Sequence, residues 1–109
     1  MLNIILASKS KVRKEILKKN CIECKVEPSN VDEEPVKDSL LNEGATPEII
    51  SKNLAELKAN KVSSLRNDVF VVGADSVIDL NGEIISKPLS RNEAFEILKK
   101  LNGKKHYLI

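Results

Sequence analysis

The segment LNIILASKSKVRKEILKK (residues 2–19) decides the fold of this chain of 109 residues. Residues 2–6 are short, apolar and β-branched, which predicts a buried strand. A polar break follows, and residues 11–19 carry apolar side chains at helical spacing, with Ser10 as the expected N-cap. These inward-facing side chains are Val12, Ile16 and Leu17. The segment therefore predicts a strand, a short polar loop and a helix, the repeating unit of an α/β protein.

The rest of the chain continues the alternation of strands and helices. Apolar runs and alternating patterns predict strands at 22–27, 68–72, 77–80, 83–86 and 106–109. Helical patterns and caps predict helices at 36–45, 47–64 and 90–101, with an acidic loop at 31–35. Asn81-Gly82 is typical of a hairpin turn, and Ser90 with Glu93 forms a capping box. We expect an α/β fold with a mixed sheet flanked by helices.

Two of the predicted helices have a face that we expect to be inside. In the helix at 47–64 the expected inward side chains are Ile50, Leu54, Leu57 and Val62. In the helix at 90–101 they are Ala94, Phe95, Ile97, Leu98 and Leu101.

Composition excludes several classes of function. There are 18 basic and 16 acidic residues, so the net charge of +2 argues against a nucleic acid polymer as partner. No apolar run approaches the roughly 18 residues of a membrane span. Residues 1–7 are too short for a signal peptide and lack a basic leader. A length of 109 residues fits one small domain, and we expect a cytoplasmic protein with no membrane contact.

Cys21 and Cys24 form a single CxxC pair. The pair could form half of a zinc site. The other half would need further Cys or His residues, and His106 is the only histidine. A redox CxxC usually begins a helix, where the dipole activates the thiol, whereas this pair follows a helix and enters a predicted strand. The position favours ordinary packing, and thiol redox chemistry is the last of the functions that we consider.

The loop before the first helix is a candidate phosphate site. Backbone N–H groups at the start of a helix suit phosphate, but the dipole contributes only about 0.3–1 kcal/mol at an exposed site. The hydroxyls of Ser8 and Ser10, with Lys9 and Arg13, would supply most of the affinity. Taken alone, the pattern is more typical of an ordinary capped helix with surface lysines.

Asp75 is a candidate for the chemistry itself. It follows an apolar strand and a Gly-Ala step, and ligands of open α/β sheets collect at the carboxyl ends of strands. A carboxylate there can bind Mg²⁺ or orient a water molecule, although it can equally cap a turn. Glu33, Lys58 and Lys87 are weaker candidates, because isolated charges on helices and loops usually face solvent.

Taken in order, these segments resemble the Maf family of nucleoside-triphosphate pyrophosphatases. LASKSKVRKEIL (6–17) resembles the opening motif L-A-S-x-S-P-R-R-x-E-L-L, and VDE (31–33) is similar to that family's V-D-E. LAELKA (54–59) and GADSVI (73–78) resemble L-A-x-x-K-A and G-A-D-T-V-V. A fifth stretch, K-P…E-A…L…L-x-G-x-x-H, is matched by Lys87-Pro88, Glu93-Ala94, Leu98, Leu101, Gly103 and His106. Five blocks cover nearly the whole chain.

The resemblance implies hydrolysis of a nucleoside triphosphate to the monophosphate and pyrophosphate with a divalent cation, Mg²⁺ or Mn²⁺. It suggests a house-cleaning role against non-canonical or modified nucleotides. It implies a fold related to the inosine-triphosphate pyrophosphatases, with a cleft between two lobes, and a homodimer is common among relatives.

By the same resemblance, each candidate residue has a role. Asp75 is the general base, and Glu33 and Asp75 bind the metal. The positions of Val12 and Ser76 are associated with selection of the base. The residues implied to bind the substrate are Ser8, Ser10, Arg13, Lys58 and Lys87.

Three departures from the family pattern bear on function. Lys11 and Val12 replace the usual Pro and Arg or Trp, and Ser76 replaces Thr or Gln, so the preferred base stays open. Family members usually continue for nearly as many residues again, so we expect residues 1–109 to be the N-terminal part of the domain. A catalytically weak nucleotide-binding or regulatory module is therefore the alternative to the enzyme.

Overall fold

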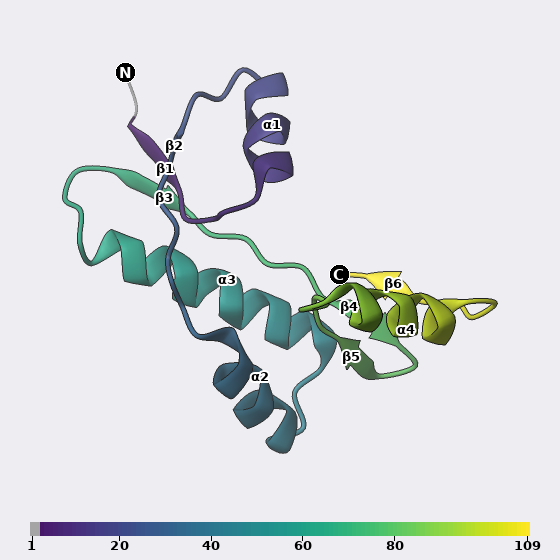
Figure 1. Ribbon diagram of the computed structural model, residues 1–109. Helices are drawn as coiled ribbons and strands as arrows, with labels where there is room; N and C mark the ends of the chain where they lie inside the picture. Colours follow the sequence, from purple (N-terminus) through teal and green to yellow (C-terminus); the bar gives the residue numbers. More distant parts are fainter. Residues whose placement is uncertain (1–2) are drawn as a thin grey trace.

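Three short parallel strands form the first sheet, in the order β2-β1-β3 (Figure 1). In the computed structural model, which describes residues 3–109, these strands are β1 (Ile4–Leu6), β2 (Lys25–Val26) and β3 (Phe70–Val72). β1 is central, because Ile5 pairs with β2 on one side and with β3 on the other. The carboxyl ends of β1 and β3 therefore lie at the same edge of the sheet, and the loops that follow them are neighbours.

Helices connect the parallel strands. α1 (Lys11–Lys19) joins β1 to β2, and α2 (Glu33–Asn42) and α3 (Pro47–Ser63) join β2 to β3. α3 packs on one face of the sheet, where Val62 meets Ile5 and Ala7 in a small core flanked by Val69 and Val71. Figure 1 shows α1 apart from α3, on the other side of the strands.

A second, antiparallel sheet has the order β5-β4-β6. Its strands are β4 (Ile78–Leu80), β5 (Glu83–Ile85) and β6 (Tyr107–Leu108), with α4 (Arg91–Leu101) between β5 and β6. The turn between β4 and β5 has Asn81 and Gly82 at φ 51° and 88°, as a tight hairpin turn requires. The predicted hairpin is confirmed.

The start of α3 connects the two sheets. Ile50 and Leu54 on α3 and Val77 before β4 form a second core, with Val36 and Leu40 of α2 packed against it. One helix therefore carries both cores, and the loop of residues 73–76 runs between them.

The predicted α/β class, with parallel and antiparallel strands and flanking helices, is confirmed. The strands are shorter than predicted, and residue 2 of the expected first strand lies outside the described residues. The predicted acidic loop at 31–35 is wrong, because α2 begins at Glu33. Two acidic residues in a first helical turn are favourable beside the positive end of the helix dipole, and this explains the early start.

Several side chains expected inside are exposed. On α4, Phe95 and Leu98 are 58% and 66% exposed, and Leu57 of α3 is 40% exposed. Val12 and Ile16 of α1 are also exposed, at 65% and 53%. The radius of gyration is 15.5 Å, compared with about 13 Å for a compact domain of this length. The described residues therefore provide no second layer over the outer faces of α1 and α4.

None of the helices within residues 3–109 has the length and apolar character that crossing a bilayer requires.

Candidate active site

The loop after β1 is organised by its two serine hydroxyls. The Ser8 hydroxyl oxygen, in a residue only 6% exposed, accepts from the Ser10 backbone N–H at 3.1 Å and from the Arg13 guanidinium at 3.1 Å. The Ser10 hydroxyl oxygen accepts from the Arg13 backbone N–H at 3.2 Å, which confirms Ser10 as the N-cap of α1. The loop therefore holds two hydroxyls and a guanidinium together at the positive end of α1.

The loop after β3 lies directly on α3, and Gly73 makes this possible. A Cβ atom at Gly73 would lie 2.2 Å from the Ala55 carbonyl oxygen and 2.9 Å from the Ala59 Cβ. Only glycine permits so close an approach of the two backbones. The Ser51 hydroxyl of α3 donates to the backbone carbonyl oxygen of Asp75 at 3.1 Å. This second contact holds the loop against the same helix.

Arg13 joins the two loops. Its Nη1 donates to the Ala74 carbonyl oxygen at 3.2 Å, and its Nη2 lies 3.5 Å from the Ser76 hydroxyl oxygen. The same guanidinium also donates to Ser8, so one side chain contacts both strand ends. This contact follows from the parallel pairing of β1 with β3, because both carboxyl ends meet at one edge of the sheet.

Asp75 is buried beside a lysine. Its side chain is 6% exposed, and Oδ1 accepts from Lys58 Nζ at 2.9 Å. Its second oxygen, Oδ2, is buried and has no hydrogen-bond partner among residues 3–109. Lys58 Nζ also lies 2.7 Å from Glu33 Oε1, so the ammonium bridges two carboxylates. A buried carboxylate oxygen without a partner is costly, and it marks a place where a cation or a donor fits.

The position of Lys58 explains its burial. The buried residues of α3 are Ile50, Leu54, Lys58 and Val62, which recur every four residues along one face. Lys58 therefore lies in the inward stripe of an otherwise apolar face, and its ammonium is directed to the carboxylates of Glu33 and Asp75. A lysine in the register of a buried stripe is the sequence signal for this role.

Glu33 is surrounded by lysines. Burial raises the pKa of the Glu33 carboxyl, but the hydrogen bond from Lys58 and the charges of Lys58, Lys37 and Lys87 outweigh burial. The resulting pKa lies below the ordinary glutamate value, so Glu33 is ionised at neutral pH. The early start of α2 brings this carboxylate to α3, which the predicted acidic loop did not anticipate.

The structure brings most of the predicted residues into one network, in which hydrogen bonds and ion pairs connect Ser8, Ser10, Arg13, Ser76, Asp75, Lys58 and Glu33. Lys87 is exposed and reaches this network only through its charge on Glu33. Val12 is 65% exposed on α1, one residue before Arg13.

Lys37 belongs to the same cluster, and the sequence patterns did not single it out. It is 7% exposed, and its Nζ lies 3.9 Å from Glu33 Oε2 and 3.7 Å from Glu34 Oε1. The available signal was its spacing, because Lys37 follows Glu33 by four residues and therefore lies on the same face of α2.

Glu33 and Asp75 carry the hard oxygen atoms that a divalent cation prefers. Glu33 and Asp75 are joined through Lys58, and Asp75 Oδ2 lacks a partner within residues 3–109. In the described part of the chain there is no group of three or more His, Cys, Asp or Glu side chains able to enclose a metal. Mg²⁺ commonly binds one or two carboxylates and completes its shell with phosphate oxygens and water.

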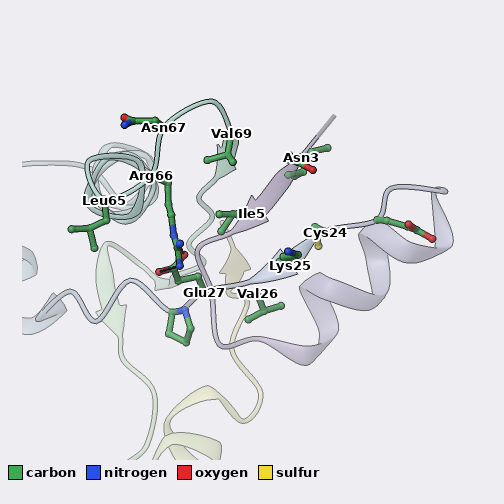
Figure 2. A pocket seen from close by; sticks show the side chains of 13 residues that line it. Asn3, Ile5, Cys24, Lys25, Val26, Glu27, Leu65, Arg66, Asn67 and Val69 are labelled. Carbon is green, nitrogen blue, oxygen red and sulfur yellow. Dashed lines mark hydrogen bonds and ion pairs between the residues drawn. The ribbon is translucent and has the colours of Figure 1, made fainter. Parts of the chain in front are cut away.

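An open cavity of about 800 Å³ lies elsewhere, beside β2 and the end of α3 (Figure 2). Figure 2 shows Arg66 reaching toward Glu27 at its wall, where two hydrogen bonds of 3.0 and 3.1 Å join them. The hydrogen bond and charge of Glu27 hold the pKa of Arg66 above its ordinary value. Cys24 lines this cavity, whereas the predicted site residues do not.

The cysteine pair lies between α1 and β2, with both thiols free. Cys21 follows the last residues of α1 and Cys24 directly precedes β2, so neither occupies the first turn of a helix. The location agrees with the sequence argument that separated this pair from helix-start redox motifs.

Comparison with known proteins places this geometry in a family. The family model described as Maf-like protein matches residues 3–109. The chain is 68% identical over 106 residues to a nucleoside triphosphate pyrophosphatase of Pelagibacter ubique, an alignment that covers 97% of this chain and 54% of the relative. A 7-methyl-GTP pyrophosphatase of Brucella abortus is 39% identical, with 96% of this chain and 53% of the relative covered. A dTTP/UTP pyrophosphatase of Fusobacterium nucleatum is 40% identical, with 97% and 52% covered.

The chain spans about half the length of the curated relatives that it matches. All of its described residues, 3–109, fall within the family model, from the first strand to β6. On these grounds the chain belongs to the Maf-like protein family.

Proposed function

We propose that the protein hydrolyses a nucleoside triphosphate to the monophosphate and pyrophosphate, with Mg²⁺ or Mn²⁺ as the divalent cation. One observation carries the proposal: Asp75 is buried with one oxygen on Lys58 and the other without a partner among residues 3–109. The names of three relatives, all pyrophosphatases of nucleoside triphosphates, support the same reaction class.

The cationic side chains and hydroxyls bind the phosphates. Ser8, Ser10 and Arg13 meet at the start of α1, where donors and the helix dipole favour an anion. Lys58 and Lys87 add positive charge from α3 and from the segment after β5. Arg13 now donates to a carbonyl oxygen and two hydroxyls, which an incoming phosphate oxygen would replace as a stronger, charged acceptor.

Glu33 and Asp75 hold the divalent cation in this proposal. When bound, the cation neutralises the developing negative charge on the phosphate oxygens. Asp75 also acts as the general base: it takes the proton from the water that attacks phosphorus in line with the departing pyrophosphate. Lys58 orients the Asp75 carboxylate through a contact of 2.9 Å, and the burial of both side chains limits the access of bulk water to that carboxylate.

The base is selected near Val12 and Ser76 in this proposal. Ser76 is next to Asp75 and within reach of Arg13, so a nucleoside that follows the phosphates would lie beside it. Val12 offers an apolar surface without a hydrogen bond to a base edge. The relatives' names make 7-methyl-GTP, dTTP and UTP the first nucleotides to compare.

Measuring pyrophosphate release tests the function. The chain is incubated with a panel of canonical and modified nucleoside triphosphates in Mg²⁺ or Mn²⁺, beside Asp75→Asn, which keeps the shape of the side chain and removes its charge. We expect turnover of at least one nucleotide. In Asp75→Asn the rate should fall by a factor of about 100 or more, the usual scale for loss of a general base. Equal rates in both proteins would reject the role of Asp75.

Nucleotide binding without turnover, whichever divalent cation is present, would favour the alternative, a catalytically weak nucleotide-binding or regulatory module. A homodimer and a cytoplasmic location stay predictions from the sequence.

A further inference from the structure

Ser51 of α3 directs its hydroxyl out of its own helix. A serine inside a helix can donate to the carbonyl oxygen four residues earlier, whereas the Ser51 hydroxyl donates to the backbone carbonyl oxygen of Asp75 at 3.1 Å. The two residues are 24 positions apart in the chain, and the contact is partly buried. The hydroxyl therefore joins α3 to the loop that carries the candidate general base.

Ser51 and Lys58 approach Asp75 from the same face of α3. Positions 51 and 58 are about two helical turns apart, so their side chains leave the helix in nearly the same direction. Lys58 Nζ contacts the carboxylate oxygen Oδ1 at 2.9 Å, and the Ser51 hydroxyl contacts the backbone carbonyl. One helix therefore holds both the side chain and the main chain of Asp75.

The loop of residues 73–76 runs along α3 toward the start of the helix. Gly73 lies against Ala55 and Ala59, and Asp75 lies against Ser51, closer to the helix start. The close approach at Gly73 fixes where the loop meets the helix. The Ser51 contact then fixes the peptide group that follows the Asp75 side chain, so the main chain of the loop is held on both sides of Ala74.

The contact from Lys58 does not hold Asp75 alone, because its ammonium is shared. Lys58 Nζ lies 2.7 Å from Glu33 Oε1 as well as 2.9 Å from Asp75 Oδ1. The direction of Asp75 Oδ2, which has no partner among residues 3–109, therefore depends also on the main chain that Ser51 holds.

We propose that Ser51 is a positioning residue for the reaction: its hydroxyl fixes the main chain of Asp75 and thereby directs the carboxylate at the attacking water. The inference rests on the proposed function, in which Asp75 is the general base. A general base must lie within hydrogen-bond reach of the proton that it takes, and a misplacement of about 1 Å can lower a rate by a factor of about 100.

Steady-state pyrophosphate release tests the inference by separating kcat from KM. The chain is compared with Ser51→Ala, which removes the hydroxyl, and Ser51→Thr, which keeps it, on the nucleotide that the native chain hydrolyses fastest. We expect kcat about tenfold lower in Ser51→Ala, with KM changed by about twofold or less, because the side chains that bind the phosphates are intact. Ser51→Thr should restore kcat to within about twofold of the native value.

Ser63→Ala is the matched control, because Ser63 is exposed at the other end of α3. It should leave kcat and KM unchanged. All variants are assayed at a temperature at which circular dichroism shows them to be fully folded. A Ser51→Ala protein with native kcat would overturn the inference: a lower melting temperature would then give Ser51 a purely structural role, and a higher KM a role in binding.

The backbone amide signals of residues 73–76 report on the loop without turnover. In NMR spectra we expect them to shift and broaden in Ser51→Ala and to keep their native positions in Ser63→Ala. Unchanged loop signals in Ser51→Ala would show that the hydroxyl does not position Asp75, even if the rate fell. A native chain that hydrolyses no nucleotide would reject the proposed function together with this role, whereas an active native chain with normal kcat in Ser51→Ala rejects the inference alone.

Discussion

The ammonium of Lys58 lies 2.9 Å from Oδ1 of Asp75 and thereby joins the middle of α3 to the loop that follows β3. Both side chains are almost completely buried, at 9% and 6% exposed. The stability of the fold depends on both partners of such a pair, because removing one leaves the other charged and buried without a counter-charge.

Replacing Lys58 with Met should therefore destabilise the protein by about 3–5 kcal/mol, because the buried Asp75 loses its counter-charge. Urea unfolding monitored by circular dichroism measures the change. In the double variant Lys58→Met/Asp75→Asn the loss should be smaller than the sum of the single losses, by about 1–3 kcal/mol. Additive losses would mean that the two groups do not interact.

Replacing Gly73 with Ala should lower both stability and nucleotide binding. The new Cβ would meet the Ala55 carbonyl oxygen at 2.2 Å, so the loop must move away from α3 and carry Asp75 with it. We expect a loss of about 1–3 kcal/mol from overpacking, with weakened pyrophosphate binding measured by calorimetry.

Gly103→Ala is the control for this prediction. Gly103 has φ +69°, but a Cβ added there would meet no atom within 4 Å, so the strain is purely conformational. The substitution should lower stability and leave pyrophosphate binding intact. Intact binding in Gly73→Ala as well would show that the close approach to α3 does not position Asp75.

Glu33 should stabilise the folded protein at neutral pH and lose this contribution in acid. Its pKa is lower in the folded protein than its ordinary value, because Lys58, Lys37 and Lys87 outweigh burial. Its ionised form therefore stabilises the fold above the unfolded pKa of about 4.3, and this contribution is lost as the pH falls through the lower folded pKa.

Unfolding of the native chain and of Glu33→Gln across pH 3–8 measures this effect. The native chain should be the more stable near neutrality, and the difference should shrink below about pH 4. A difference that grows with acidification would contradict the direction of the shift.

The same substitution should have very different effects on α3 and α4. Leu54 is fully buried, so Leu54→Ala should cost about 2–5 kcal/mol through lost packing and a cavity. Leu98 is 66% exposed, so Leu98→Ala should change stability by about 0.5 kcal/mol or less. Similar losses at both positions in thermal unfolding would show that Leu98 is covered in solution, by a second copy for example.

Local patterns predicted the elements well where a cap or a turn is encoded by neighbouring residues. The start of α1 at Lys11, the start of α3 at Pro47 and the Asn81-Gly82 turn were all predicted correctly. An acidic run such as residues 32–34 is typical both of a solvated loop and of a first helical turn, so its local pattern does not distinguish the two. Packing of Val36 and Leu40 against the core on α3 favours the helix, and this contact lies outside the local pattern.

The sequence by itself determined the order of strands and helices, the family and the residue types of the site. These depend on side chains close together along the chain, where spacing and capping act directly. Tertiary structure alone decided that Arg13 reaches Ala74 and that Lys58 bridges Glu33 and Asp75. It also decided that Lys37 is buried while Phe95 is exposed. The physical reason is that burial and charge pairing depend on which elements pack together, and that packing joins residues far apart in the chain.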